Sequence, residues 1–326
     1  MKSKLQFIFI VIVVTLLSFS PKINFGQAPD LGTASGFALF TAAGAFDNLG
    51  ASSVTGDIGS NSYSVTGFPP GVVTGTIHNP PDAALAQAAI DVNTAYTYLS
   101  TLGGSVIGVL LGNGQVLTPG VYNTGAASTL NGNLTLDGQG DPDALFIIRI
   151  GGAFATSSSS NVILINSASL CNVYWQIGGQ FDLGDGSVFA GTIVVDGAIN
   201  LLEASSLHGR ALSRAGAISS HNNMVNFLPA AAGIITGTAI VCQGQTGVNY
   251  FVPLITDATG YVWTLPFGAT ITAGANTNSI TVDFSSAASS GNITVYGTNA
   301  CGNGIVSPDY ALTVSPLPLT SLIYHQ

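Results

Sequence analysis

The pattern of polar and apolar positions repeats along the first two thirds of the chain. Four segments follow the order small, Ser, any, apolar, any, Gly, and they are 51–56, 127–132, 186–191 and 204–209. A short alternating strand that buries one apolar residue and then turns at Gly is typical of a β-solenoid rung, because each coil covers only its neighbours. The repeat predicts stacked rungs with a ladder of Ser and Thr on their outward surface.

The pattern changes near residue 230, which indicates two folded units. Upstream, the nearly continuous apolar runs 144–150, 162–165, 172–177 and 192–195 are typical of buried parallel strands. Downstream, the segments 250–252, 261–265, 279–284, 292–296 and 310–314 alternate, which favours an antiparallel sandwich. We therefore predict a solenoid at 27–230, a sandwich at 233–316 and a tail at 317–326.

One helix is predicted inside the first unit. Asn79 is a suitable N-cap, and Pro80 and Pro81 suit a first helical turn. Apolar residues then recur at helical spacing up to Gly103, namely Leu85, Ala89, Val92, Tyr96 and Leu99. We expect this helix to lie along the solenoid and to cover one apolar flank.

The first 26 residues resemble an export signal. Lys2 and Lys4 precede an apolar run at 5–17 that is short for a membrane span, so we expect removal of 1–26 and secretion. No later segment is apolar enough to insert into a membrane, and both free secretion and attachment to the cell surface through the C-terminal module stay open.

Charge excludes several classes of partner. All three lysines lie at positions 2, 4 and 22, so three arginines remain against fifteen acidic residues. Nucleic acid and anionic membranes attract basic surfaces, and neither is expected as a partner. Only 6% of the residues are charged, so the surface consists largely of hydroxyl and amide groups, and we expect a monomer.

The three cysteines of an exported chain allow one disulfide. Cys242 and Cys301 lie in the same C-terminal unit, and we predict that they pair. Cys171 precedes an apolar stretch, so we interpret it as a buried free thiol.

No constellation of catalytic or metal-binding residues is recognisable. The four histidines are scattered without ligand spacing, and no nucleophile or phosphate-loop motif occurs. The acidic segment 137–143 could bind calcium, but Asp, Gly and Pro also form tight polar turns, which is the interpretation we favour. Arg149 stands among isoleucines, and we expect it to pair with a turn aspartate. The sequence predicts no enzyme, no metal and no cofactor.

Several motifs resemble one known family in their order along the chain. They are 31–34 (LGTA), 67–71 (GFPPG), 75–78 (GTIH), 117–122 (LTPGVY), 136–142 (LDGQGDP), 171–176 (CNVYWQ) and 209–212 (GRAL). Together they resemble the microbial ice-binding (antifreeze) proteins of the DUF3494 type. The segments 241–245 and 299–302 resemble a PKD-like, immunoglobulin-type module of secreted Bacteroidetes proteins.

The resemblance implies a mainly β fold, in which a right-handed, discontinuous parallel solenoid of triangular section carries one helix alongside. It also implies a flat face that adsorbs to an ice crystal surface. Aligning the family's Thr-(Ala/Gly)-x-(Thr/Asn) motif with this chain assigns the following residues to that face: Ser52, Ser128, Thr129, Thr156, Ser159, Ser187, Ser205, Ser206 and Asn222. Asp185 and Glu203 depart from the motif, because a hydrated carboxylate does not match a crystal plane.

Two functions of different classes follow. The first is a secreted ice-binding protein that inhibits recrystallisation and gives moderate thermal hysteresis. The second is a surface adhesin or polysaccharide-binding solenoid.

Overall fold

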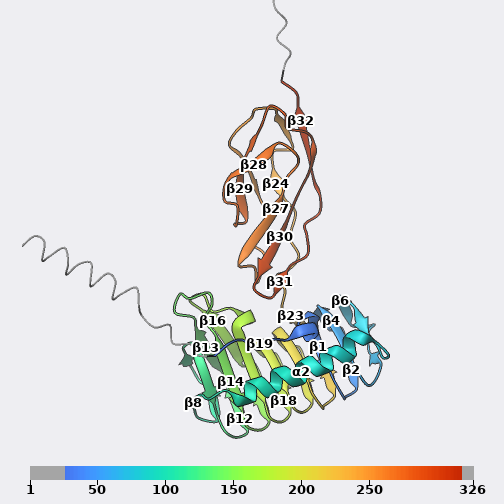
Figure 1. The fold of residues 1–326 in the computed structure, drawn as a ribbon, viewed down its shortest axis with the longest axis vertical. Helices are drawn as coiled ribbons and strands as arrows, with labels where there is room; N and C mark the ends of the chain where they lie inside the picture. The colour runs from blue at the N-terminus through green and yellow to red at the C-terminus, as the bar shows by residue number, and fades with distance from the viewer. Residues whose placement is uncertain (1–25, 318–326) are drawn as a thin grey trace, which may run out of the picture.

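The computed structural model describes residues 26–317 and shows a solenoid of stacked rungs with a β-sandwich standing on one of its sides (Figure 1). The predicted signal and tail lie outside the described residues, apart from Gly26 and Leu317. No helix within residues 26–317 is long and apolar enough to cross a membrane.

The solenoid has three sides, and all of its strand pairs are parallel. One side is a separate sheet, here called the eight-stranded side. Its strands in spatial order are β5 (Val65–Thr66), β2 (Phe46–Asn48), β22 (Ile218–Ser220), β20 (Ile199–Leu201), β18 (Phe181–Leu183), β15 (Phe154–Thr156), β12 (Ser128–Asn131) and β9 (Leu110–Gly112).

The other two sides belong to one fifteen-stranded sheet that bends along its length. The long strands β19 (Val188–Val195) and β21 (Ser206–Ser213) run through both sides and pair at Gly191 and Gly209. Both glycines have positive φ, and a Cβ at Gly209 would lie 1.9 Å from the carbonyl oxygen of Gly191. These positions therefore require glycine to make the bend.

The first of these two sides, called the sandwich-bearing side, also contains β6 (Val72–Thr74), β3 (Ser53–Thr55), β23 (Met224–Asn226), β16 (Asn161–Ile165), β13 (Asn133–Asp137) and β10 (Gln115–Leu117). The second, called the helix-covered side, contains β7 (Ile77–His78), β4 (Asp57–Ser60), β1 (Phe37–Thr41), β17 (Val173–Ile177), β14 (Phe146–Ile150), β11 (Gly120–Asn123) and β8 (Ser105–Val106).

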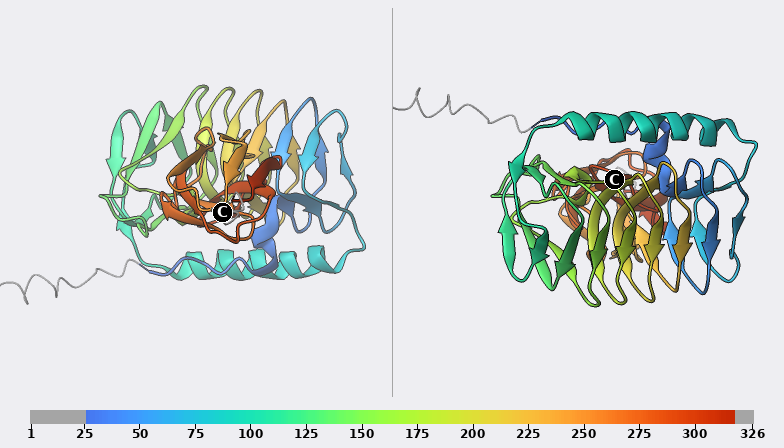
Figure 2. Two further views of the ribbon diagram at one scale, coloured as in Figure 1. Left: turned by 90° about the horizontal axis from the view of Figure 1, so that it is seen from above. Right: turned by 90° about the horizontal axis from the view of Figure 1, so that it is seen from below.

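The order of the rungs differs from the order of the chain. The N-terminal strands β1, β2 and β3 pair with the late strands β21, β22 and β23. Figure 2 shows these blue strands beside the yellow ones, with the helix running back along the stack. The discontinuous solenoid implied by the resemblance is therefore confirmed.

Helix α2 (Ala83–Thr101) covers the side named after it. Its N-cap is Asp82 rather than the expected Asn79, whose side chain instead accepts a hydrogen bond from the backbone N–H of Val65 at 2.7 Å. The apolar face packs against strand residues that include Phe40, Tyr174 and Val194. The strands beneath are buried on both faces, which explains their continuous apolar runs.

Arg149 does not pair with an aspartate as expected. Its Nη2 donates to the carbonyl oxygen of Ser100 at 2.7 Å, and its Nη1 donates to that of Leu102. Arg149 therefore satisfies carbonyl groups that the end of α2 leaves without partners.

The rungs enclose a core of aromatic and aliphatic side chains. Trp175 is fully buried, lies 5.6 Å from Phe154 and 4.7 Å from Phe189 between ring centroids, and donates its indole N–H to the carbonyl oxygen of Ala190. Such packing holds each rung rigidly in place. Of the two short 3₁₀ helices, η2 (Leu170–Asn172) packs against this core, whereas Ala34 of η1 (Gly32–Gly36) packs with the residues of α2.

The C-terminal unit consists of two sheets. One contains β24 (Thr236–Gly237), β26 (Val248–Phe251), β29 (Ser279–Phe284) and β28 (Ala269–Ala273), and the other contains β25 (Ile240–Cys242), β32 (Tyr310–Ser315), β30 (Gly291–Asn299), β27 (Gly260–Thr264) and β31 (Gly302–Asn303). Every pair is antiparallel except β25 with β32. The antiparallel sandwich predicted from the alternating segments is confirmed.

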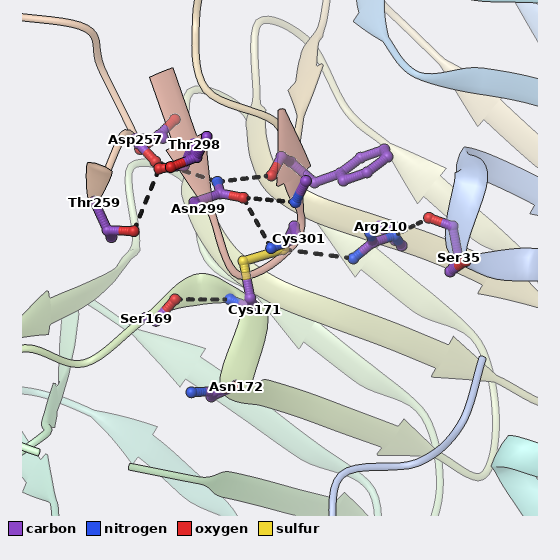
Figure 3. Close-up of a disulfide and its surroundings, with 12 residues drawn as sticks. Ser35, Ser169, Cys171, Asn172, Arg210, Asp257, Thr259, Thr298, Asn299 and Cys301 are labelled. Carbon is purple, nitrogen blue, oxygen red and sulfur yellow. Dashed lines mark hydrogen bonds between the residues drawn. A yellow bond between two sulfur atoms is a disulfide. The ribbon is translucent and has the colours of Figure 1, made fainter. Parts of the chain in front are cut away.

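The predicted disulfide is wrong. Cys301 bonds to Cys171 of the solenoid (Figure 3). Cys242 is free and exposed. Cys242 lies opposite Ser315 at the end of β32, whereas Cys301 follows β30, which runs antiparallel to β32. From Gly291, opposite Leu312, the eight residues to Asn299 span about 27 Å, so the two cysteines lie at opposite ends of the sandwich.

Other contacts join the two units beside this disulfide. Nη1 of Arg210 on β21 donates to the sulfur of Cys301 at 3.7 Å, and within the solenoid the Cζ atom of Arg210 lies 3.8 Å from the centre of the Phe227 ring. Burial lowers the pKa of Arg210 to about 10, so the side chain stays charged at neutral pH. Asp257 of the sandwich also lies 3.2 Å from Nδ1 of His208 on β21. The sandwich is therefore attached through the chain itself and through a second, covalent point.

Candidate functional site

The eight-stranded side is the part of the solenoid that the other described elements leave uncovered. Helix α2 covers one side, and the sandwich stands on another through Cys171, His208 and Asn226. In Figure 2 the helix and the sandwich lie against different sides of the stack. The uncovered side is thus the candidate surface for contact with a partner.

Two columns of outward residues run across this side. Because Phe46, Ile218 and Ile199 pair with one another and point into the core, the residues before and after them point outward. The first column is mostly alanine, comprising Ala45, Ala217, Ala198, Gln180, Ala153 and Ala127. The second column comprises Thr66, Asp47, Ser219, Asn200, Asp182, Ala155, Thr129 and Leu110.

Hydrogen bonds between rungs fix the polar members of the second column. Ser219 donates to the amide oxygen of Asn200 at 2.9 Å, and Asn200 donates to Asp182 at 2.7 Å. Gln180 also donates to Asp182 at 2.7 Å, and Thr66 donates to Asp47. The two carboxylates are thus acceptors within a ladder, which limits the directions in which they bind water.

The surface is regular in spacing as well as in composition. Adjacent parallel strands lie about 4.8 Å apart, so the methyl and hydroxyl groups repeat at that interval along the stack. Towards β9 the side is less level, because Leu110 stands beside small residues around a hollow of about 300 Å³ lined by residues that include Ala127, Ala153 and Ala155. The level part of the surface therefore lies over the central rungs.

Five of the nine site residues predicted from sequence are buried and cannot touch a partner. Ser52, Ser128, Thr156, Ser187 and Ser205 are between 0% and 7% exposed. Their hydroxyl groups bond within the corner turns; for example, Thr156 accepts from the N–H of Gly184 at 2.8 Å and Ser187 donates to the carbonyl oxygen of Ser157 at 2.8 Å. They satisfy backbone groups where the strands turn and no sheet partner is available.

The other four reach the surface, but from different sides. Thr129 is exposed on the eight-stranded side, Ser159 and Asn222 lie in corner turns, and Ser206 begins β21 on the sandwich-bearing side. Asp185 and Glu203 lie in the same corners, where Asn222 donates to Glu203 at 2.8 Å. Asp185 and Glu203, the two departures from the motif, therefore lie outside the level surface of the eight-stranded side.

The sequence motifs do not point to the alanine column or to the ladder. The signal is present in the sequence, because most strands of this side, such as β2, β18 and β20, have an outward residue between two buried ones. Only the assignment of these short strands to one shared sheet was lacking.

No group of three His, Cys, Asp or Glu side chains that could hold a metal ion occurs among residues 26–317. In the acidic segment 137–143, Asp137 and Asp141 accept hydrogen bonds from the backbone N–H groups of Gln139 and Asp143. This is the pattern of a polar turn.

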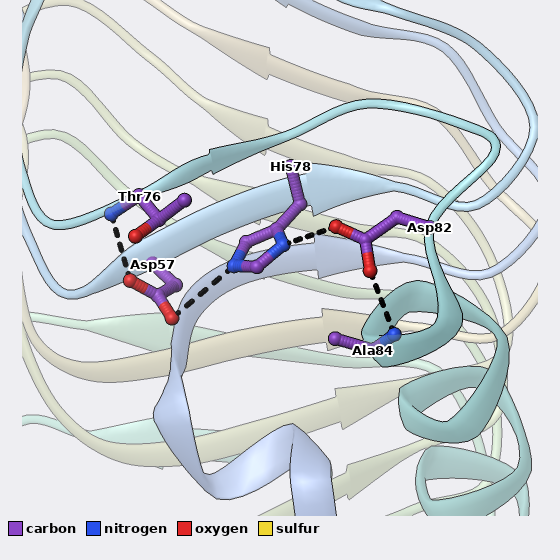
Figure 4. A network of polar contacts seen from close by, with 5 residues as sticks. All are labelled: Asp57, Thr76, His78, Asp82 and Ala84. Carbon is purple, nitrogen blue, oxygen red and sulfur yellow. Dashed lines mark hydrogen bonds and ion pairs between the residues drawn. The ribbon is translucent and has the colours of Figure 1, made fainter.

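A polar network lies outside the candidate surface, at the start of α2 (Figure 4). Nδ1 of His78 lies 2.6 Å from Asp82, the N-cap of the helix, and Nε2 lies 3.3 Å from Asp57 on β4. Burial alone lowers the pKa of His78, but the hydrogen bonds and charges of Asp82 and Asp57 outweigh burial and raise the pKa above 6.5. The network ties the helix to two rungs.

We expect this network to stabilise the fold below about pH 6.5 and to weaken as pH rises through the raised pKa of His78. Hydrogen bonding to His78 lowers the pKa of Asp82, so the network also weakens in strong acid, below the ordinary aspartate value of 3.8. The melting temperature of His78→Gln should fall less between pH 6 and pH 9 than that of the wild type. The control is His221→Gln, because only backbone groups of His221 form hydrogen bonds within residues 26–317; equal slopes for His78→Gln and wild type would contradict the assignment.

One side of the solenoid is uncovered, regular and nearly uncharged. A protein with such a side belongs to the class that binds an extended surface rather than a small molecule. Comparison with known families identifies the class further. A family model described as ice-binding-like matches residues 40–226, and a PKD-like domain model matches residues 228–311. The chain therefore belongs to the ice-binding-like family, a non-enzymatic family, and carries a PKD-like domain.

Individual relatives agree with this assignment. The chain is 37% identical over 230 residues to an ice-binding protein of Nostoc sp. (strain HG1). The aligned region covers 69% of this chain and 84% of that protein. It is 31% identical over 215 residues to an ice-binding protein of Flavobacterium frigoris (strain PS1), covering 58% and 74% respectively. The crystal structure of an ice-binding protein from the Antarctic ascomycete Antarctomyces psychrotrophicus has a TM-score of 0.59 and 33% identity, covering 61% of this chain and 98% of that one.

Proposed function

We propose that this chain binds ice through its eight-stranded side. The observation that carries the proposal is the double column of small and hydrogen-bonded residues on the uncovered side. Methyl groups on a rigid grid order the adjacent water, and fixed hydroxyl and amide groups anchor it. Many weak contacts then act together, so adsorption needs no pocket, cofactor or net charge.

The proposal extends to the consequences of adsorption. A protein fixed to a crystal surface blocks growth between the attached molecules, so the chain inhibits recrystallisation and gives moderate thermal hysteresis. We also propose that it acts outside the cell. The apolar run at 5–17 supports export, and the disulfide between Cys171 and Cys301 suits an oxidising compartment.

Ice partitioning of the full chain without its signal tests the function. A fluorescently labelled sample is exposed to a slowly growing ice hemisphere, together with an unrelated labelled protein as the control. We expect the chain to enter the ice while the control stays in the liquid, and we expect smaller crystals after annealing in frozen sucrose. Exclusion of the chain from the ice would overturn the proposal.

A further inference from the structure

The two ends of the solenoid differ in how their outer strands are protected. Exposed sheet edges invite pairing with other chains unless proline, charge or a covering element blocks them. At the end formed by β5, β6 and β7, the prolines Pro69, Pro70 and Pro81 stand in the connections, and His78 and Asp82 supply charge.

Within residues 26–317, the opposite end has no charged side chain on its outer strands, and Pro119 follows β10 at the step to the next rung instead of standing between two outer strands. Its outer strands β8, β9 and β10 each pair on one side only, with β11, β12 and β13. Their aliphatic side chains are among the most exposed in the described structure, with Val106 at 83%, Leu110 at 68% and Val116 at 56%. Open backbone edges and exposed aliphatic side chains therefore meet at this end.

The segment that forms this end also carries no charged side chain, and this favours a second copy of the chain as the partner. No Asp, Glu, Lys, Arg or His occurs from residue 92 to residue 136, although the chain as a whole carries a net charge of −9. A second copy of an acidic chain is repelled by most of the surface but not by an uncharged end. The same end of another copy also presents the same aliphatic residues.

We propose that this end docks against the same end of a second copy of the chain. A two-fold axis through the eight-stranded side reverses the strand direction, so β9 pairs with β9 of the second copy in antiparallel fashion, and β10 lies next to β8 of the second copy. Leu110 then lies beside the partner's Leu110. Because the opposite end is blocked, association closes at a dimer rather than continuing into a fibre.

The pairing has a consequence for ice binding, and this part rests on the proposed function. The two eight-stranded sides become one sheet, so the level surfaces over the central rungs of both copies are offered to the same crystal face. The dimer departs from the monomer expected from the sequence, because only the fold places the uncharged stretch at an end of the stack.

Sedimentation velocity of the full chain without its signal, measured over a series of concentrations, tests the pairing. We expect reversible dimerisation, and we expect Leu110→Lys to weaken it about tenfold or more because two ammonium groups would face each other. The matched control is Val72→Lys, at a site on β6 that is 62% exposed at the blocked end; it should dimerise like the wild type.

Two results would overturn the pairing: a wild type that stays monomeric at every concentration, or a Val72→Lys variant that loses the dimer as Leu110→Lys does. Ice partitioning of the same samples separates the two proposals. A dimer that does not enter ice contradicts only the proposed function, and a monomer that enters ice contradicts only the pairing.

Discussion

Replacing Ala198 by tyrosine is expected to abolish most of the adsorption to ice while leaving the fold intact. Ala198 lies in the alanine column between Ala217 and Gln180, at the centre of the eight-stranded side. A phenol ring there projects above the neighbouring methyl groups and holds the crystal away from several rungs at once. Because adsorption depends on many contacts acting together, we expect the apparent affinity to fall at least about tenfold, equivalent to about 1.4 kcal/mol.

Ser219→Tyr on the adjacent rung should act in the same way, since Ser219 lies in the second column and its hydroxyl group donates into the ladder. The control is Asn93→Tyr on the exposed face of α2, which adds the same ring away from the surface. Ice partitioning and thermal hysteresis measure the effect, and the melting temperature checks the fold. Folded Ala198→Tyr and Ser219→Tyr variants that enter ice like the wild type would place the site elsewhere.

The choice of these positions shows what the sequence pattern could and could not provide. The repeated phrase correctly predicts rungs, and its fourth residue is the buried one, as at Val54 and Leu207. The Ser at the second position is two residues earlier, and a strand has a period of two, so Ser52 and Ser205 point to the same interior. The sequence pattern therefore placed an outward hydroxyl ladder at positions that point inward. A Ser128→Tyr variant would disturb the core rather than test contact with ice.

Other features needed the fold itself. Arg149 bonds to the end of a helix some 50 residues earlier in the chain, and no local pattern indicates that contact. The three sides are also invisible in the sequence, because β1, β2 and β3 join the stack next to strands from the end of the solenoid. Local periodicity predicted the types of element, whereas long-range pairing decided which residues share a surface.

The disulfide illustrates the same limit and leads to the second large effect. Cys171 and Cys301 are separated by 130 residues, and in the chain-entropy model a cross-link over that length stabilises the folded chain by about 5 kcal/mol. The bond also holds the sandwich against Arg210, Phe227 and the pair His208–Asp257. Without it, the only covalent attachment of the sandwich is the chain near residues 227–232, and the remaining contacts are non-covalent.

We expect the double variant Cys171→Ser/Cys301→Ser to lose a large part of this stabilisation and to melt in two separate calorimetric transitions. Removing both cysteines avoids a new disulfide between Cys242 and whichever partner remains. The control is Cys242→Ser, which removes a free and exposed thiol and should melt like the wild type. Peptide mapping under non-reducing conditions should recover Cys171 linked to Cys301, with Cys242 open to alkylation. A double variant that melts like the wild type, or a Cys242→Ser variant with an equal loss, would contradict the covalent joint. Because the eight-stranded side lies away from this joint, ice partitioning of the double variant should persist below its first melting transition.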